Sequence, residues 1–150
     1  MKRSAIDMSY YIVNYCNENC IKISNLKLQK LLYYVQAAFL VSGKEAFEDE
    51  IRPWRYGPVV SDVYQEFKIY VNRDIDDIFP DIALEENEKK IVDKVIESYR
   101  YYTPPQMINK THNEEPWKNA YSNRDNVIAK ETIREYYNRH KDFLYGESKG

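Results

Sequence analysis

The segment from Asn25 to Gly43, NLKLQKLLYYVQAAFLVSG, constrains the fold of this 150-residue chain more than any other. Its first half carries one apolar stripe with the spacing of an α-helix, and its second half is apolar on nearly all sides. The stripe consists of Leu28, Leu31, Leu32, Val35 and Phe39. A helix that is apolar all round has to be covered by other elements, so we expect it at the centre of a helical fold. Ser24 is placed to cap its start, and Gly43 to end it.

Apolar residues with helical spacing predict further helices on both sides of this segment. They lie at residues 5–17, 58–71, 91–102, around 107–108, at 116–121 and at 131–140. Pro58 and Pro116 each stand where the first turn of a helix would begin, a position that tolerates proline. Thr103 and Gln106 fit a capping box at the start of a short helix, and the acidic run from Asp74 to Asp81 indicates a loop.

Residues 47–56 interrupt the helical period and indicate a short extended piece. We expect Val127 and Ile128 to pair with it near Ile51. The prediction is a mainly α fold, a single compact helical domain of about six to seven helices over residues 1–145, with a small two- or three-stranded antiparallel β element near residues 47–56 and 126–129. Residues 146–150 are expected to form a flexible tail.

Charge and composition argue against several classes of function. The 22 basic and 24 acidic side chains are mixed along the chain and leave a net charge of −2, so we do not expect a nucleic-acid-binding surface. No stretch reaches the ~20 apolar residues of a membrane span, and the first residues lack the apolar core of a secretory signal, so we expect a cytoplasmic protein. No glycine-rich phosphate loop points to a cofactor, and Cys16 and Cys20 lack the second pair of a zinc site.

The hexapeptide from Trp54 to Val59, WRYGPV, is unusual in a chain of amphipathic helices. We expect Trp54 and Tyr56 to be buried or stacked, and Gly57 to let the chain turn before the next helix. The chain also contains 15 tyrosines, which suit either a core with polar edges or a binding surface. The core is the interpretation that we favour for most of them.

His112 and Glu114 are the strongest candidates for chemistry, because a histidine held by a carboxylate can act as a general base. The alternative, which we favour, is that His112 anchors a turn while Glu114 places negative charge near the start of the helix at Pro116. No catalytic residue is therefore assigned.

The sequence does not assign a role to three basic side chains, Arg55, Lys27 and Lys30. Arg55 could stack on an aromatic ring, pair with a carboxylate such as Glu114, or contact an acidic partner, and a buried pair is the interpretation that we favour. Lys27 and Lys30 stand three apart on the polar side of the central helix, where two solvated lysines are ordinary.

Three stretches stand out when their order and spacing are considered together. They are LKLQKLLYYVQAAFL at Leu26 to Leu40, IRPWRYGPVVSDVYQEFK at Ile51 to Lys68, and THNEEPW at Thr111 to Trp117. In register, they resemble the Panacea domain family, an antitoxin-associated domain that includes SocA-like and phage-associated GepA-like proteins. The resemblance extends from about Ile6 to Tyr137. The residues that it marks, with Arg55 between them, are Leu28, Lys30, Leu31, Leu32, Tyr33, Tyr34, Trp54, Arg55, Tyr56, Gly57, Pro58, Val59, Thr111, His112, Glu114, Pro116 and Trp117.

The resemblance implies a mainly helical antitoxin without enzymatic activity, cofactor or metal, often encoded beside its toxin on a mobile genetic element. Such a protein neutralises its cognate toxin by direct protein–protein binding, and the marked residues would be structural or partner-binding. A second hypothesis is a proteolytic adaptor that delivers the toxin or another client to an ATP-dependent protease. A third is an enzyme that uses His112 and Glu114. The identity of the toxin and the formation of homo-oligomers stay open.

Overall fold

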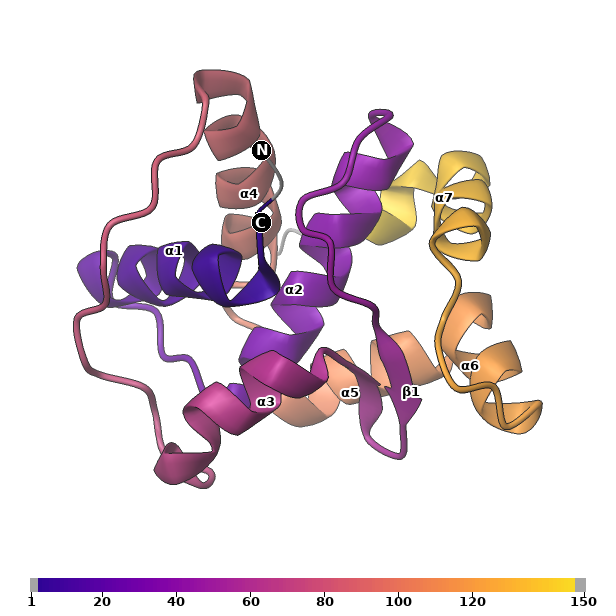
Figure 1. Ribbon diagram of the computed structural model, residues 1–150, viewed down its shortest axis with the longest axis horizontal. Helices are drawn as coiled ribbons and strands as arrows, with labels where there is room; N and C mark the ends of the chain where they lie inside the picture. Colours follow the sequence, from indigo (N-terminus) through magenta and orange to yellow (C-terminus); the bar gives the residue numbers. More distant parts are fainter. Residues whose placement is uncertain (1–2, 148–150) are drawn as a thin grey trace.

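The structure, a computed structural model, describes residues 3–147. Within this range the chain forms seven α-helices and one two-stranded antiparallel sheet, which confirms the predicted mainly α fold (Figure 1). The helices are α1 (Ala5–Glu18), α2 (Asn25–Val41), α3 (Ser61–Phe67), α4 (Glu86–Ser98), α5 (Pro104–His112), α6 (Glu115–Ser122) and α7 (Lys130–Arg139). The strands are β1 (Arg52–Trp54) and β2 (Gly57–Val59), and short 3-10 turns lie at Lys68–Tyr70 and Lys141–Leu144.

Helix α2 forms the centre of the fold, as its sequence predicts. All of its residues except Leu26 and Val41 are buried, and α1, α3, α4, α5, α7 and β2 pack against it. Figure 1 shows α2 crossing the middle of the molecule, with α1 and α4 on one side and α7 on the other. Ser24 Oγ accepts the Lys27 N–H at 3.2 Å, and Gly43 follows the end of α2 with a φ of +97°, so both predicted boundaries are confirmed.

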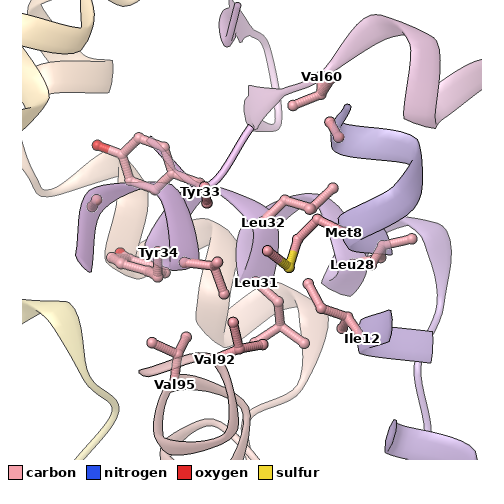
Figure 2. Close-up of a cluster of buried hydrophobic side chains, with 14 of the residues drawn as sticks. Met8, Ile12, Leu28, Leu31, Leu32, Tyr33, Tyr34, Val60, Val92 and Val95 are labelled. Atoms are coloured by element: carbon pink, nitrogen blue, oxygen red, sulfur yellow. The ribbon is translucent and has the colours of Figure 1, made fainter. Parts of the chain in front are cut away.

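The hydrophobic core forms where α1 and α4 cover α2. Figure 2 shows Leu28 and Leu31 beside Met8 and Ile12 of α1, with Val92 of α4 in the same cluster. These side chains are fully buried, and burying each one contributes about 1.5–3 kcal/mol. This burial, more than intrinsic helix propensity, holds the three helices together.

The solvated face predicted for Lys27 and Lys30 is wrong, because both side chains are buried. The Lys27 amine donates to the carbonyl oxygens of Arg100 at 3.3 Å and Tyr102 at 2.8 Å, and the Lys30 amine donates to the carbonyl oxygen of Pro58 at 3.3 Å. The segment after α4 and strand β2 therefore cover the polar side of α2 with backbone acceptors, which the spacing of α2 alone does not reveal.

Strands β1 and β2 form a hairpin closed by Arg55 and Tyr56. Just before β1, Ile51 makes an isolated bridge to Ile128, whose N–H donates to the Ile51 carbonyl at 2.7 Å. The expected pairing of these two segments is confirmed at that one point. The main partner of β1 is β2, which the sequence pattern does not indicate.

The helix predicted to begin at Pro58 is wrong, since Pro58 lies in β2 and α3 begins at Ser61. Pro58 faces Pro53 across the hairpin. Because neither proline has an N–H, the pair suits a position of the ladder that makes no hydrogen bonds. The fixed φ of proline is compatible with an extended strand as well as with the first turn of a helix, so the local sequence does not separate the two.

Local signals place several other elements correctly. Gln106 N–H donates to Thr103 Oγ1 at 3.3 Å and Thr103 N–H donates to Gln106 Oε1 at 2.8 Å, which is the capping box predicted for α5. Pro116 lies in the first turn of α6, and Asp74 to Asp81 is irregular. Within the described range, none of the helices has the length and apolar character needed to cross a membrane.

The end of the chain is described only in part. Residues 148–150 of the predicted flexible tail lie outside the described residues. At the start of that tail, the Gly146 N–H donates to Ser98 Oγ at 2.9 Å. The domain boundary at residue 145 stays a prediction.

Candidate functional site

The three motif stretches meet at the β1–β2 hairpin. From α2, Gln29 Oε1 accepts the Val60 N–H at 2.9 Å and the Lys30 amine donates to the Pro58 carbonyl. From α6, Trp117 Nε1 donates to the carbonyl oxygen of Trp54 at 2.8 Å. Side chains of the first and third stretches thus satisfy backbone groups of the second, which fixes the hairpin against the helices.

Gly57 lies where the hairpin packs against Lys30 of α2. Its φ is +114°, a conformation that glycine adopts without a steric penalty. A Cβ atom at this position would lie 2.4 Å from Lys30 Cε and 3.1 Å from Thr111 Oγ1. The glycine of the motif is therefore required by both its backbone conformation and the close approach of two other motif residues.

Lys30 is fully buried and makes one hydrogen bond to the part of the chain that the structure describes, at the Pro58 carbonyl. A buried ammonium group with a single acceptor is poorly compensated for the water that it loses. Burial lowers the pKa of Lys30 to about 7. The amine under the hairpin therefore loses its proton far more readily than a solvated lysine does.

The His112 ring packs against Trp117, with ring centroids 3.9 Å apart and planes at 11°. Its Nε2 atom is buried and has no hydrogen-bond partner among residues 3–147. Burial lowers the pKa of His112, a hydrogen bond with the backbone of Arg55 opposes that shift, and the nearby charge of Lys30 adds to it. His112 is therefore a neutral ring that packs between the hairpin and α6.

Glu114 is buried at the junction of α5 and α6. Its carboxylate accepts the hydroxyls of Tyr34 at 2.7 Å and Tyr137 at 2.6 Å, and the Lys110 amine at 2.7 Å. The Lys110 amine also lies 4.3 Å from the centroid of the Tyr34 ring. These contacts tie the junction to α2 and α7. His112 is not among the partners of Glu114, so the arrangement lacks the carboxylate-held histidine that the enzyme hypothesis requires.

The buried pair expected between Arg55 and Glu114 is wrong. Arg55 is exposed, and its guanidinium lies 5.5 Å from the centroid of the neighbouring Tyr56 ring. Tyr56 is itself exposed, whereas Trp54 is half-buried and meets Tyr64 edge to face at 5.2 Å. At the tip of the hairpin, the motif therefore turns its arginine and one aromatic ring toward solvent.

The other marked residues contribute to the core. Tyr33 and Tyr34 are buried, and the hydroxyls of Tyr33 and Tyr137 lie 3.0 Å apart. Burial raises the pKa of each of these tyrosines above its ordinary value. The remaining buried members of the set are Leu28, Leu31, Leu32, Pro58, Val59, Thr111, Pro116 and Trp117. The expectation that many tyrosines serve the core is confirmed for these residues.

An open groove of about 890 Å³ lies on the outer face of the hairpin. Trp54, Arg55 and Tyr56 of the hairpin line it together with Tyr64 of α3 and Tyr121 of α6. The first turns of α2 and α5 complete its walls with Asn25, Leu26, Pro104 and Pro105.

Three large apolar or aromatic side chains stand exposed at the groove. The exposed fractions are 57% for Tyr56, 74% for Val71 and 43% for Tyr121. Val71 has φ +59° and ψ −112°, an outlier for a β-branched residue that costs on the order of 1–3 kcal/mol. Strain of this kind is found preferentially at functional sites, so it supports a functional role for the groove.

The sequence pattern predicts only the hairpin part of this groove. It placed Val71 at the end of a helical stripe, but α3 ends at Phe67 and a 3-10 turn leads Val71 out of the core. For Tyr64 and Tyr121, the sequence predicts only that they lie in helices. No local signal brings these residues to the hairpin, because the contact depends on how α3 and α6 pack.

The fold and the groove together define a helical domain that presents aromatic rings and one cation on a hairpin held by hydrogen bonds from α2 and α6. The chain belongs to the antitoxin SocA-like, Panacea domain family, whose family model matches residues 28–118. This range is more than half of the chain and reaches into all three motif stretches. Membership gives the protein a general antitoxin-associated role. The comparisons with curated proteins and with solved structures found no match.

Proposed function

We propose that this protein is an antitoxin that neutralises a cognate protein toxin by binding it directly through the groove. The observation that carries the proposal is the exposure of Tyr56, Val71 and Tyr121 around Arg55 at one hollowed site. Aromatic side chains and arginine dominate the binding energy of protein–protein interfaces. A cluster of exposed apolar side chains in a small protein marks an interaction surface more often than an isolated one does.

The rigid frame under the groove supports the same function. The hairpin is held by hydrogen bonds from Gln29, Lys30 and Trp117, so its tip loses little conformational entropy when a partner binds. A typical stable interface involves roughly 20 residues on each side, so we expect the toxin to cover the groove and the surfaces of α3 and α6 beside it.

Co-expression with the product of the neighbouring gene tests this function. We expect growth arrest by that product to be relieved by the wild-type protein and by a Tyr101→Ala variant, which loses an exposed tyrosine outside the groove. A variant that combines Tyr56→Ala with Tyr121→Ala should lose the relief. Absence of relief by the wild-type protein, or full relief by the double variant, would contradict the proposal.

The abundance of the toxin in the same cells separates neutralisation by occlusion from delivery to an ATP-dependent protease. Under direct neutralisation, the toxin level stays unchanged while its activity is lost. A shorter toxin half-life that depends on this protein would instead support the adaptor hypothesis.

A further inference from the structure

We infer that the groove binds an extended, proline-containing segment of the partner that places a carboxylate against Arg55. This inference rests on the proposed function, because it specifies which kind of toxin segment the groove would hold. Three properties carry it, namely the state of the hairpin edges, the free hydrogen-bond donors and the charge of the groove.

The edges of the hairpin are already occupied. On the side of β1, the Ile51 carbonyl accepts the Ile128 N–H, and Pro53 has no N–H to offer. On the side of β2, the Pro58 carbonyl accepts the Lys30 amine and the Val60 N–H donates to Gln29. A partner strand cannot extend the sheet at positions whose backbone groups are used in this way. The partner must therefore be recognised by the side chains that line the groove.

Several groups in the groove are available to donate hydrogen bonds. Across residues 3–147, Trp54 Nε1 and the hydroxyls of Tyr56, Tyr64 and Tyr121 bond to no other residue of the chain. The carbonyls of a bound α-helix would already be paired within the helix. A polyproline II segment makes no internal hydrogen bonds, so its carbonyls need such donors, and its proline rings pack on aromatic faces. The lining thus favours an extended segment that contains proline.

The charge in the groove is positive only. Arg55 is the only charged side chain among the described residues that line it, and it makes no ion pair with another described residue. The first turns of α2 and α5 form part of the walls, and the N-terminal end of a helix carries partial positive charge. An acidic residue of the partner would gain from both sources, and a basic residue would be repelled by both.

Single-stranded RNA could also use aromatic faces and an arginine. Its phosphates would meet one cation in this groove, on a protein with a net charge of −2. Sequence-independent binding of nucleic acid depends on several lysines or arginines along the backbone path. The observations therefore favour an acidic peptide, and RNA binding becomes one of the outcomes that the test can detect.

The test compares four fluorescent probes by anisotropy with the full-length protein: peptides of alternating glutamate and proline, lysine and proline, or glutamate and alanine, and an oligouridylate. We expect the glutamate–proline peptide to bind at least about tenfold more tightly than each of the others, a difference of about 1.4 kcal/mol. In ¹H–¹⁵N spectra it should shift the indole signal of Trp54, assigned with Trp54→Phe, more than that of Trp117. Equal or tighter binding of any other probe would overturn the inference.

Two variants test whether Arg55 is responsible for the preference for the glutamate–proline peptide over the lysine–proline peptide. Arg55→Gln should lose most of the preference for the glutamate–proline peptide over the lysine–proline peptide, and only the part due to the helix N-termini should remain. Arg139→Gln, which removes an exposed arginine of α7 outside the groove, should keep the full preference. Retention of the full preference in Arg55→Gln would contradict the assigned contact. If the variant with Tyr56→Ala and Tyr121→Ala fails to neutralise the toxin while the peptides bind without preference, only the segment chemistry is wrong. If that variant still neutralises, the proposed binding site itself is wrong.

Discussion

Replacing Lys30 with methionine should stabilise the protein at neutral pH and weaken the pH dependence of its stability. Burial lowers the pKa of Lys30 from 10.5 to about 7 in the folded state. Between these two values the unfolded chain binds more protons than the folded chain, so the free energy of unfolding rises with pH. At pH 7 the cost of burying this amine is on the order of 4 kcal/mol, and it falls by roughly 1–2 kcal/mol toward pH 8.5.

Methionine fills a similar volume without a charge. The Pro58 carbonyl then loses its hydrogen-bond donor, which costs about 1 kcal/mol. The net gain of Lys30→Met is therefore about 3 kcal/mol at pH 7, decreasing toward pH 8.5. Lys22→Met is the matched control, because Lys22 is exposed and its replacement should change the stability by less than about 0.5 kcal/mol.

Urea unfolding at the two pH values, followed by circular dichroism, measures both quantities. Burial also lowers the pKa of Lys27 and Lys110, which contributes a slope of the same sign to wild type and variant alike. The informative quantity is therefore the difference between the two proteins. A Lys30→Met variant that is less stable than wild type at both pH values, or that keeps the full wild-type pH dependence, would show that the burial of Lys30 does not carry this cost.

Three further substitutions test the frame under the groove. Glu114→Gln removes the buried charge that pairs with the partly exposed Lys110 and should lower the free energy of unfolding by about 2 kcal/mol, while Glu115→Gln, at an exposed position, should not. Equal effects would contradict the network around Glu114. Gly57→Ala should lower the free energy of unfolding by about 1–3 kcal/mol through backbone strain, and further through the clash with Lys30. Adding Lys30→Ala should recover the part due to the clash, as measured by thermal unfolding. Trp117→Phe removes the indole donor to the Trp54 carbonyl and should lower the free energy of unfolding by about 1 kcal/mol, measured by urea unfolding. An unchanged midpoint would argue against this hydrogen bond.

The central helix and most helix boundaries could be predicted because their signals are local. These signals depend on residues a few positions apart. They are the apolar residues on nearly all sides of α2, the N-cap at Ser24 and the capping box of Thr103 and Gln106. The motif stretches were also visible in the sequence. Their contacts in the folded protein could not be predicted from it, because Lys30 and Gln29 contact a hairpin that lies 28 to 31 residues further along the chain.

The errors have a common physical origin. Pro58 has a backbone preference that suits both a strand and a helix start, and only the pairing with Pro53 decides between them. Lys30 looked solvated because helical spacing shows which side of α2 is polar but not what covers that side. Arg55 was expected to pair with Glu114, but three other groups already satisfy that carboxylate. Each outcome depends on contacts between distant segments.

The groove is the part of the site that the sequence predicts least. The motif alone indicates three of its residues, Trp54, Arg55 and Tyr56. The resemblance implies that they are either structural or partner-binding. Tyr64 and Tyr121 join them only when α3 and α6 pack around the hairpin. Their helical spacing would be the same if the rings faced elsewhere.

Calorimetric titration of the purified toxin into this protein measures binding at the groove. Wild type and Tyr101→Ala should bind with the same affinity. The variant with Tyr56→Ala and Tyr121→Ala should bind at least about a hundredfold more weakly, since two exposed aromatic anchors at a typical interface together contribute about 3 kcal/mol or more. If this variant binds the toxin as tightly as wild type does, the groove is not the toxin-binding site.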